Sequence, residues 1–313
     1  MILRNTRLPV ILAVSVLVNI LFALQYLASH PINFPVAASK KKPWSPALFD
    51  QCCKEDQSVL IKDQSPAFSF CLYPQGKDRH VADSVYRGAG TSDGIFEAAI
   101  RQEMLSALEE LNDPNAVVLD IGGNIGLHTM FLANAGYKVH AFEPMLSNYQ
   151  LLSCSATSNS RLYNNVVANN YGLGRKAEKT CIVADKDNFG AAKIKVGQTC
   201  SPENTVEVRR LDQYLIKNKL KPALVKVDTE GYEFKALEPA KEYFRKYPPA
   251  HIFSEFCPRH FRDVGDDAAK FLEFFWDLGY KIEVGQFKDV QKGDEAYEKL
   301  FKDDLSDIHM YRD

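Results

Sequence analysis

The sequence predicts an α/β fold: a seven-stranded, mostly parallel sheet with helices on both faces, preceded by an N-terminal transmembrane helix. Short apolar runs alternate with helical patterns from about residue 94 to residue 280, and this alternation produces right-handed crossovers and a parallel sheet. A glycine-rich turn follows the first apolar run, and two strand-like segments end the chain. An uncharged apolar run near the amino terminus predicts the membrane helix.

The amino-terminal run, residues 8–28, consists mostly of Leu, Val, Ile and Ala. Its length matches the about 20 residues that span a bilayer as a helix. A cleaved signal peptide has an apolar core of about 7–15 residues, and residues 36–39 make a poor cleavage site, so a signal anchor is favoured. The arginines of residues 1–7 lie directly before the run, whereas the lysines at 40–42 lie farther away. We therefore expect a short cytosolic tail of residues 1–7 and a lumenal carboxyl-terminal part in the Golgi or endoplasmic reticulum.

Residues 29–90 are expected to form a stem and an irregular region, and residues 91–313 the folded domain. The chain has seven cysteines, at positions 52, 53, 71, 154, 181, 200 and 257. They are compatible with an oxidising compartment, and their odd number leaves at least one unpaired. Cys181 and Cys200 flank a predicted hairpin and could be bridged, which the sequence leaves open. No Cys/His spacing of a zinc site is present, so the sequence predicts no metal site.

Periodicity and turn residues predict the individual elements. Thr91-Ser-Asp is expected to cap a helix over 94–111, and Asn112-Asp-Pro ends that helix. A helix over 266–278 is stopped by Gly279. The strands of the main sheet are expected at 117–120, 138–142, 163–168, 224–227, 251–255, 280–284 and 308–312, with further helices after Gly126 and from about residues 147, 212 and 233. Polar alternation at 180–184 and 191–196 predicts a separate hairpin.

The glycine loop is the first candidate for a binding site. Gly122 and Gly126 form a tight turn between the strand 117–120 and the next helix, which lets backbone amides approach a ligand. Glu143 ends the following strand, where a carboxylate can accept hydrogen bonds from both ribose hydroxyls. Asp120 opens the loop; it would repel a phosphate but can hold the ammonium of an amino acid. The loop therefore predicts a site for S-adenosylmethionine rather than a dinucleotide, with a turn that binds nothing as the alternative.

A second polar group follows the buried strand 224–227. Lys226 interrupts this strand, and Asp228 and Glu230 emerge at its carboxyl end, the edge where open α/β sheets bind ligands. Three ionisable groups at a strand end are costly unless they are paired or functional. The alternative is structural: Lys226 forms a salt bridge to a neighbouring carboxylate, and Asp228 caps the next helix.

The two stretches together resemble the FkbM-type family of S-adenosylmethionine-dependent methyltransferases, which implies a Rossmann-like class I methyltransferase fold. The resemblance extends from about residue 94 to residue 280 and is carried by Asp120-Ile-Gly-Gly-Asn-Ile-Gly-Leu-His-Thr, Ala141-Phe-Glu-Pro with Asn148, Asn188-Phe-Gly190, Leu211-Asp212, and Lys226-Val-Asp-Thr-Glu-Gly-Tyr-Glu with Leu237. Members of this family mostly methylate hydroxyls of sugars and small natural products. The resemblance implies that the cofactor is held by Asp120, Gly122, Asn124, Gly126 and Glu143, and that Lys226, Asp228 and Glu230 face the reacting centre.

O-methylation requires a general base, because an alcohol loses its proton as it attacks the methyl group. Asp228 is the first candidate and Glu230 the second, with Lys226 setting their charge. His128, just after the glycine loop, could serve instead, although a lone histidine more often packs or forms a hydrogen bond. Glu255, at the end of the next strand, is a candidate for the substrate pocket.

Two other classes of function are compatible with the sequence. A membrane-anchored lumenal glycosyltransferase would use Asp228 and Glu230 to bind a metal and a nucleotide sugar, and a non-catalytic binding protein would keep the fold without the reaction. The net charge of −2, from 38 basic and 40 acidic residues, provides no basic field for nucleic acid. The expected partners are a membrane, through residues 8–28, and a small-molecule or glycan hydroxyl acceptor.

Overall fold

The structure is a computed structural model that describes residues 41, 43–90, 94–185, 188–195, 200–302 and 305–312. Residues 44–313 form one compact unit. The expected membrane span at 8–28 and the expected cap at 91–93 lie outside the described residues. Within the described part of the chain, no helix combines the length and the apolar character that a membrane span requires.

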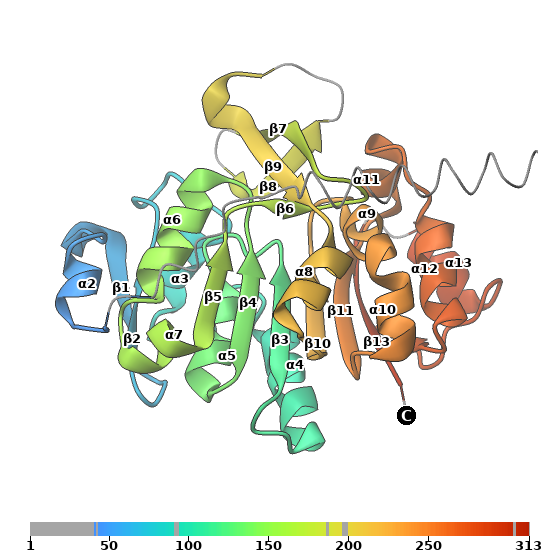
Figure 1. The fold of residues 1–313 in the computed structure, drawn as a ribbon, viewed down its shortest axis with the longest axis horizontal. Coiled ribbons are helices and arrows are strands. Elements are labelled where there is room, and N and C mark those ends of the chain that lie inside the picture. The colour runs from blue at the N-terminus through green and yellow to red at the C-terminus, as the bar shows by residue number, and fades with distance from the viewer. Residues whose placement is uncertain are drawn as a thin grey trace, which may run out of the picture. The chain divides into compact units, whose positions relative to one another are not determined.

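The core of the unit is a seven-stranded sheet whose strands run parallel except one (Figure 1). Its order is β12 (Lys281–Glu283), β13 (Ser306–Tyr311), β11 (His251–Phe256), β10 (Pro222–Val227), β3 (Val117–Ile121), β4 (Lys138–Phe142) and β5 (Val166–Asn169). Strand β13 is antiparallel to both of its neighbours. The predicted sheet and its terminal antiparallel pair are therefore confirmed.

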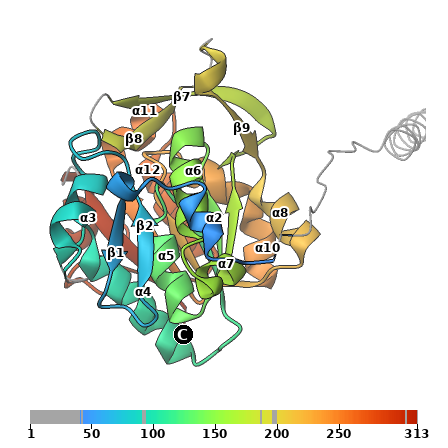
Figure 2. The same cartoon turned by 90° about the vertical axis from the view of Figure 1, so that its left-hand side faces the viewer.

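Helices cover both faces of this sheet (Figure 2). Successive residues of a strand contribute to different cores. Val118 belongs to the core beneath α4, α5, α6 and α7, whereas Leu119 and Ile121 belong to the core beneath α8, α9, α10 and α12. Asp120 therefore points to the same face as Val118. The helices span Ala98–Leu111 (α4), Leu127–Ala135 (α5), Leu146–Ser155 (α6), Ser160–Asn165 (α7), Leu211–Asn218 (α8), Glu233–Leu237 (α9), Lys241–Lys246 (α10), Pro258–Asp263 (α11), Ala268–Asp277 (α12) and Glu295–Lys302 (α13).

Three predicted boundaries differ from the structure. The segment 163–168 is expected to be a strand throughout, but α7 begins at Ser160, where the side chain of Asn159 accepts a hydrogen bond from the amide of Leu162 at 2.8 Å, and it occupies residues up to Asn165. The helix expected over 266–278 is α12, which begins at Ala268 because Asp267 caps it in the same way. The helix expected from residue 94 is α4, which begins at Ala98.

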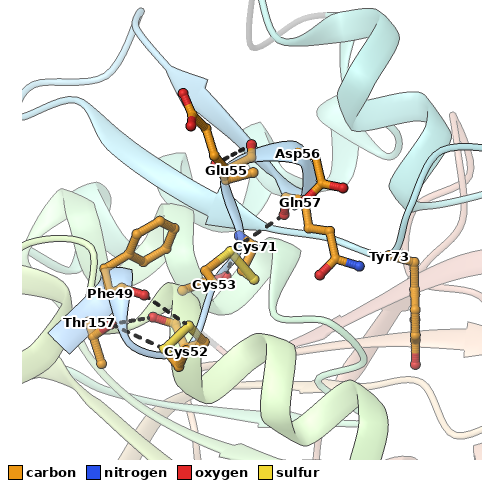
Figure 3. The surroundings of a disulfide bond; sticks show 12 residues. Phe49, Cys52, Cys53, Glu55, Asp56, Gln57, Cys71, Tyr73 and Thr157 are labelled. Atoms are coloured by element: carbon orange, nitrogen blue, oxygen red, sulfur yellow. Dashed lines mark hydrogen bonds between the residues drawn. A yellow bond between two sulfur atoms is a disulfide. The ribbon is translucent and has the colours of Figure 1, made fainter. Parts of the chain in front are cut away.

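Residues 47–90, expected to be irregular, contain α2 (Ala47–Asp50), a hairpin of β1 (Ser58–Ile61) and β2 (Phe68–Cys71), and α3 (Ala82–Gly88). Phe68 and Phe70 are buried in the core beneath α4 and α5. Disulfides join Cys52 to Cys154 of α6 and Cys53 to Cys71 of β2 (Figure 3). The boundary expected at residue 91 therefore lies inside the compact unit.

A smaller four-stranded sheet lies above the carboxyl ends of β3, β4 and β10 (Figure 1). Its order is β6 (Gly172–Leu173), β9 (Thr205–Arg209), β7 (Glu178–Asp185) and β8 (Asn188–Lys195). Strands β7 and β8 form the predicted hairpin, and the suggested bridge between Cys181 and Cys200 is present. Cys257 is buried and unpaired. The small sheet thus forms a roof over the edge where the candidate residues emerge.

Candidate active site

The candidate residues meet in a crevice at the carboxyl ends of β3, β4 and β10, beneath β8. The crevice has two parts, which we call the apolar lobe and the acidic lobe. The apolar lobe, of about 60 Å³, is lined by Phe142, Glu143, Leu173, Ile182, Phe189 and Ile194, among others. The acidic lobe, of about 120 Å³, is lined by Glu97, His128, Lys226 and Glu255, among others. Gly122, Asn124, Gly190, Asp228 and Glu230 line both lobes, so the two lobes adjoin.

Gly122 brings the loop after β3 against the end of β10. Its φ is +82°, in the left-handed region that favours glycine, and a Cβ there would lie 1.7 Å from the carbonyl oxygen of Asp228. Only glycine permits this approach. The two edges of the crevice are therefore in direct backbone contact.

Glu143 lies at the wall of the apolar lobe with a buried side chain. The amide of Asn124 donates to its Oε2 at 2.9 Å, and the amide of Met145 donates to its Oε1 at 2.7 Å. Burial raises the pKa of Glu143 to about 7, although these two hydrogen bonds oppose the shift. Each carboxylate oxygen has a second lone pair, so both oxygens can still accept a hydrogen bond from a ligand.

Lys226 links β10 to β3. The parallel register places it beside Asp120, and its Nζ lies 3.2 Å from Asp228 Oδ2, 3.6 Å from Asp120 Oδ1 and 3.1 Å from the carbonyl oxygen of Gly122. Burial disfavours the charged ammonium, but Asp228, Asp120 and Glu97 outweigh this effect and raise the pKa of Lys226. The salt bridge considered as the structural alternative is thus present, and it lies inside the crevice wall.

Asp120 lies behind the crevice. Its side chain is fully buried, its Oδ2 accepts a hydrogen bond from Thr129 Oγ1 at 2.5 Å, and it is not among the lining residues of either lobe. Its Oδ1 faces Lys226 and has no hydrogen-bond donor among the described residues. In this position Asp120 contacts Lys226 and Thr129, and its contact with a ligand ammonium stays a prediction.

Asp228 and Glu230 reach the crevice together with Glu255 of β11 and His260 of α11. Nδ1 of His260 lies 3.3 Å from Glu230 Oε2 and 3.6 Å from Glu255 Oε2. Lys193 of β8 lies 3.9 Å from Glu230. Burial raises the pKa of both Glu230 and Glu255, and the carboxylates nearby raise it further. These groups can therefore carry protons under conditions where ordinary carboxyl groups are ionised.

Two site residues were not identified in the sequence. A hydrogen bond of 2.8 Å joins Oε2 of Glu97 to Nε2 of His128. Both residues line the acidic lobe. His260 follows β11 by four positions and comes to the same edge through α11. The sequence signal available for His260 was its position shortly after a strand end. Glu97 directly precedes α4 and comes to the site because α4 packs against β10.

The residues of the crevice fit an adenosyl ligand. The apolar lobe combines an aromatic and aliphatic lining with the carboxylate of Glu143, which suits a base and a ribose with two hydroxyl donors. Asn124 and Gly122 present the loop backbone to both lobes. Each lobe is smaller than the about 300–1,000 Å³ of a typical ligand site, so binding must displace side chains of the crevice wall.

Comparison with protein families finds one match that covers more than half of the chain: the family described as "Methyltransferase FkbM domain" matches residues 120–282. No curated protein matches the chain.

Among solved structures, the methyltransferase FkbM from Methylobacillus flagellatus KT is similar with 15% identity over 63% of this chain and a TM-score of 0.41. The chain spans 44% of the length of that protein. Magnesium protoporphyrin IX methyltransferase from Synechocystis PCC 6803 with bound SAM has 12% identity over 77% of this chain and 88% of its own, with a TM-score of 0.41. Precorrin-6y C5,15-methyltransferase from Geobacter metallireducens GS-15 has 15% identity over 70% of this chain and 90% of its own, with a TM-score of 0.38.

We predict that Glu143→Ala weakens binding of S-adenosylmethionine by about 1.5–3 kcal/mol, or about 10- to 100-fold in Kd, because the ribose hydroxyls lose a charged acceptor.

Because the pKa of Glu143 is raised to about 7, the ligand-free protein holds a proton there below pH 7 and must release it on binding. Affinity of the unaltered protein should therefore fall below pH 7, and Glu143→Gln should abolish this dependence.

Isothermal titration calorimetry in buffers of different ionisation enthalpy measures both the affinity and the released proton. Glu207→Ala, at an exposed carboxylate of β9, is the matched control and should bind normally. Unchanged affinity and proton release in folded Glu143 variants would show that Glu143 does not bind the ribose.

Proposed function

Because the chain belongs to the FkbM family of methyltransferases, we propose that it is an O-methyltransferase acting on a hydroxyl of a sugar or small molecule. Its cofactor is S-adenosylmethionine. The observation that carries the proposal is the adjoining pair of lobes: a carboxylate suited to a ribose in one, and a group of carboxyl side chains that includes Asp228 in the other. A methyl donor that occupies the first lobe would direct its reactive end to the second.

Five residues are proposed to hold the cofactor. Glu143 would accept the ribose hydroxyls, and the loop from Gly122 through Asn124 to Gly126 would present its backbone to the ligand. Asp120 would contribute indirectly, because it holds Lys226, whose ammonium donates a hydrogen bond to the carbonyl oxygen of Gly122 in the loop. When bound, S-adenosylmethionine supplies a methyl group that leaves sulfur for the acceptor oxygen as that oxygen loses its proton.

Asp228 is proposed as the general base that takes this proton, with Glu230 as the second candidate. Asp228 is partly exposed to the crevice and contacts Lys226 through Oδ2, which leaves Oδ1 for the acceptor. The ammonium of Lys226 lies 3.2 Å from this carboxylate, so the proposed base has a cation beside it. Glu230 is more enclosed and its pKa is raised, which favours the protonated form before the reaction. These charges rank Asp228 first.

A groove of about 1160 Å³ supports an acceptor of considerable size. It runs between α4 and the strands β12 and β13, and its lining includes Phe253, His309 and Tyr311. A small cavity that shares Phe253 and Asp307 with this groove also touches Asp228 and Glu255. Aromatic side chains with polar neighbours suit the mixed surface of a sugar. We therefore propose this groove as the acceptor side of the site.

The glycosyltransferase alternative loses its support, because the family that matches the chain is one of methyltransferases. A non-catalytic role is not favoured either, because Lys226, Asp228 and Glu230 all line the crevice.

We also propose that residues 8–28 anchor the protein in the membrane of the Golgi or endoplasmic reticulum, with residues 44–313 in the lumen. Three disulfides support this placement, because disulfides persist in oxidising compartments and are rare in the cytosol. One of them joins Cys52 to Cys154 across a sequence separation of 102 residues.

Methyl transfer to a set of hydroxylated glycans and small molecules, measured with radiolabelled S-adenosylmethionine, tests the proposed function. We predict that Asp228→Asn lowers turnover by about 10²- to 10⁴-fold while much of the cofactor affinity remains, since a positioned base contributes about this factor to the chemical step. Glu230→Gln is the paired variant. Near-normal turnover in Asp228→Asn together with a large loss in Glu230→Gln would assign the base role to Glu230.

The membrane topology is tested by protease protection. The carboxyl terminus should resist proteolysis in intact microsomes and become accessible after detergent is added, because the membrane would enclose residues 44–313. Digestion of that terminus without detergent would reverse the proposed orientation.

A further inference from the structure

Two groups of potential metal ligands lie beside the acidic lobe, and Asp228, Glu230 and Glu255 belong to its lining. Oxygen or nitrogen atoms of Glu230, Glu255 and His260 all lie within 4.8 Å of one another, as do carboxylate oxygens of Asp228, Glu233 and Glu255. Ligands of a hard divalent cation lie about 2.0–2.6 Å from the ion, so opposed ligands are roughly 4–5 Å apart. The atoms of both groups lie within this limit of one another, with His260 Nδ1 3.3 Å from Glu230 and 3.6 Å from Glu255, and Glu255 belongs to both groups.

Glu233 provides an independent sign of a missing positive partner. Its side chain is 1% exposed. Oε1 accepts from the amide of Thr229 at 2.8 Å, the hydroxyl of Thr229 at 3.1 Å and the amide of Gly231 at 3.0 Å, whereas Oε2 has no partner among the described residues. A buried carboxylate oxygen without a partner is costly, and this one belongs to the group formed with Asp228 and Glu255.

When Glu230 and Glu255 are ionised, the carboxylates of this group outnumber the cations that the described residues place beside them. Lys226 contacts Asp228 but is shared with Asp120, and Lys193 lies no closer than 3.9 Å to Glu230. An acceptor hydroxyl that loses its proton beside these carboxylates would meet repulsion of like charges. A cation among them would remove this repulsion and stabilise the acceptor oxygen.

We propose that Glu230, Glu255 and His260 bind a divalent cation, with Asp228 and Glu233 beside it. Two carboxylates and one imidazole suit Mg²⁺ or Mn²⁺, with the nitrogen ligand favouring Mn²⁺. The role of the cation rests on the proposed function, since it would act on the methyl acceptor; the binding of the cation does not. Glu230, Glu255 and His260 are then ligands, and Asp228 remains the base.

Titration of the purified full-length chain with Mn²⁺, followed by electron paramagnetic resonance of the free ion, tests the site without any acceptor. We expect one bound Mn²⁺ per chain. Glu255→Gln in β11 and His260→Gln in α11 should each weaken binding at least about tenfold, the scale of the loss when support of a metal site is removed. Glu273→Gln, which alters a half-exposed carboxylate paired with Lys292, is the matched control and should bind Mn²⁺ normally.

Calorimetry with S-adenosylmethionine in metal-free buffer separates this proposal from the proposed function. The cation site is wrong if the cofactor binds but Mn²⁺ does not. It is also wrong if both variants bind Mn²⁺ as the control does. In either case the carboxylates serve another partner, such as a cationic group of the acceptor. If Mn²⁺ binds and the variants lose it while the cofactor fails to bind, the cation site stands and the proposed function fails. Circular dichroism of both variants shows whether either loss reflects unfolding.

Discussion

The ammonium of Lys226 is the interaction on which both edges of the crevice depend. Lys226 belongs to β10, which lies between β3 and β11 in the sheet. Its ammonium contacts Asp120, Asp228 and the carbonyl oxygen of Gly122. Without it, Asp120 would be a fully buried charge whose remaining partner is a hydroxyl, and breaking a buried pair in this way costs about 3–5 kcal/mol. The same charge keeps the glycine loop and the end of β10 at a fixed separation, which the backbone contact between Gly122 and Asp228 requires.

Residues 47–90 lie outside the part of the chain that matches the family, and they also contribute to the site. The match covers residues 120–282, but His80 and Val81 line the acidic lobe. Tyr73 stacks on Phe189 of the roof with ring centroids 4.6 Å apart, and its hydroxyl donates to Asn148 Oδ1 at 2.7 Å. The disulfide of Cys52 joins this region to α6 through Cys154, and the disulfide of Cys53 closes the region internally through Cys71 (Figure 3). Residues outside the family match therefore contribute to the acidic lobe directly and support the apolar lobe through Phe189 and Asn148.

The sequence was sufficient for the central sheet and for both edges of the crevice, because buried strands read as apolar runs and the carboxyl ends of parallel strands meet at one edge. The sequence was insufficient where contacts between residues distant in the chain determine the structure. Helix α7 occupies the first part of the expected strand 163–168. Strands β6 and β9 are short and were not predicted. Glu97 joins the site only when α4 packs on β10, and no local pattern indicates that Asp120 points toward Thr129 rather than into the crevice.

A crystal structure of the chain with S-adenosylhomocysteine tests the central claim most directly, because it locates the nucleoside and the reactive end at once. The account predicts that both ribose hydroxyls contact Glu143, that the sulfur faces Asp228, and that Lys226 keeps its contacts with Asp120 and Asp228. A nucleoside bound away from Glu143, or a sulfur that faces away from the acidic lobe, would contradict it.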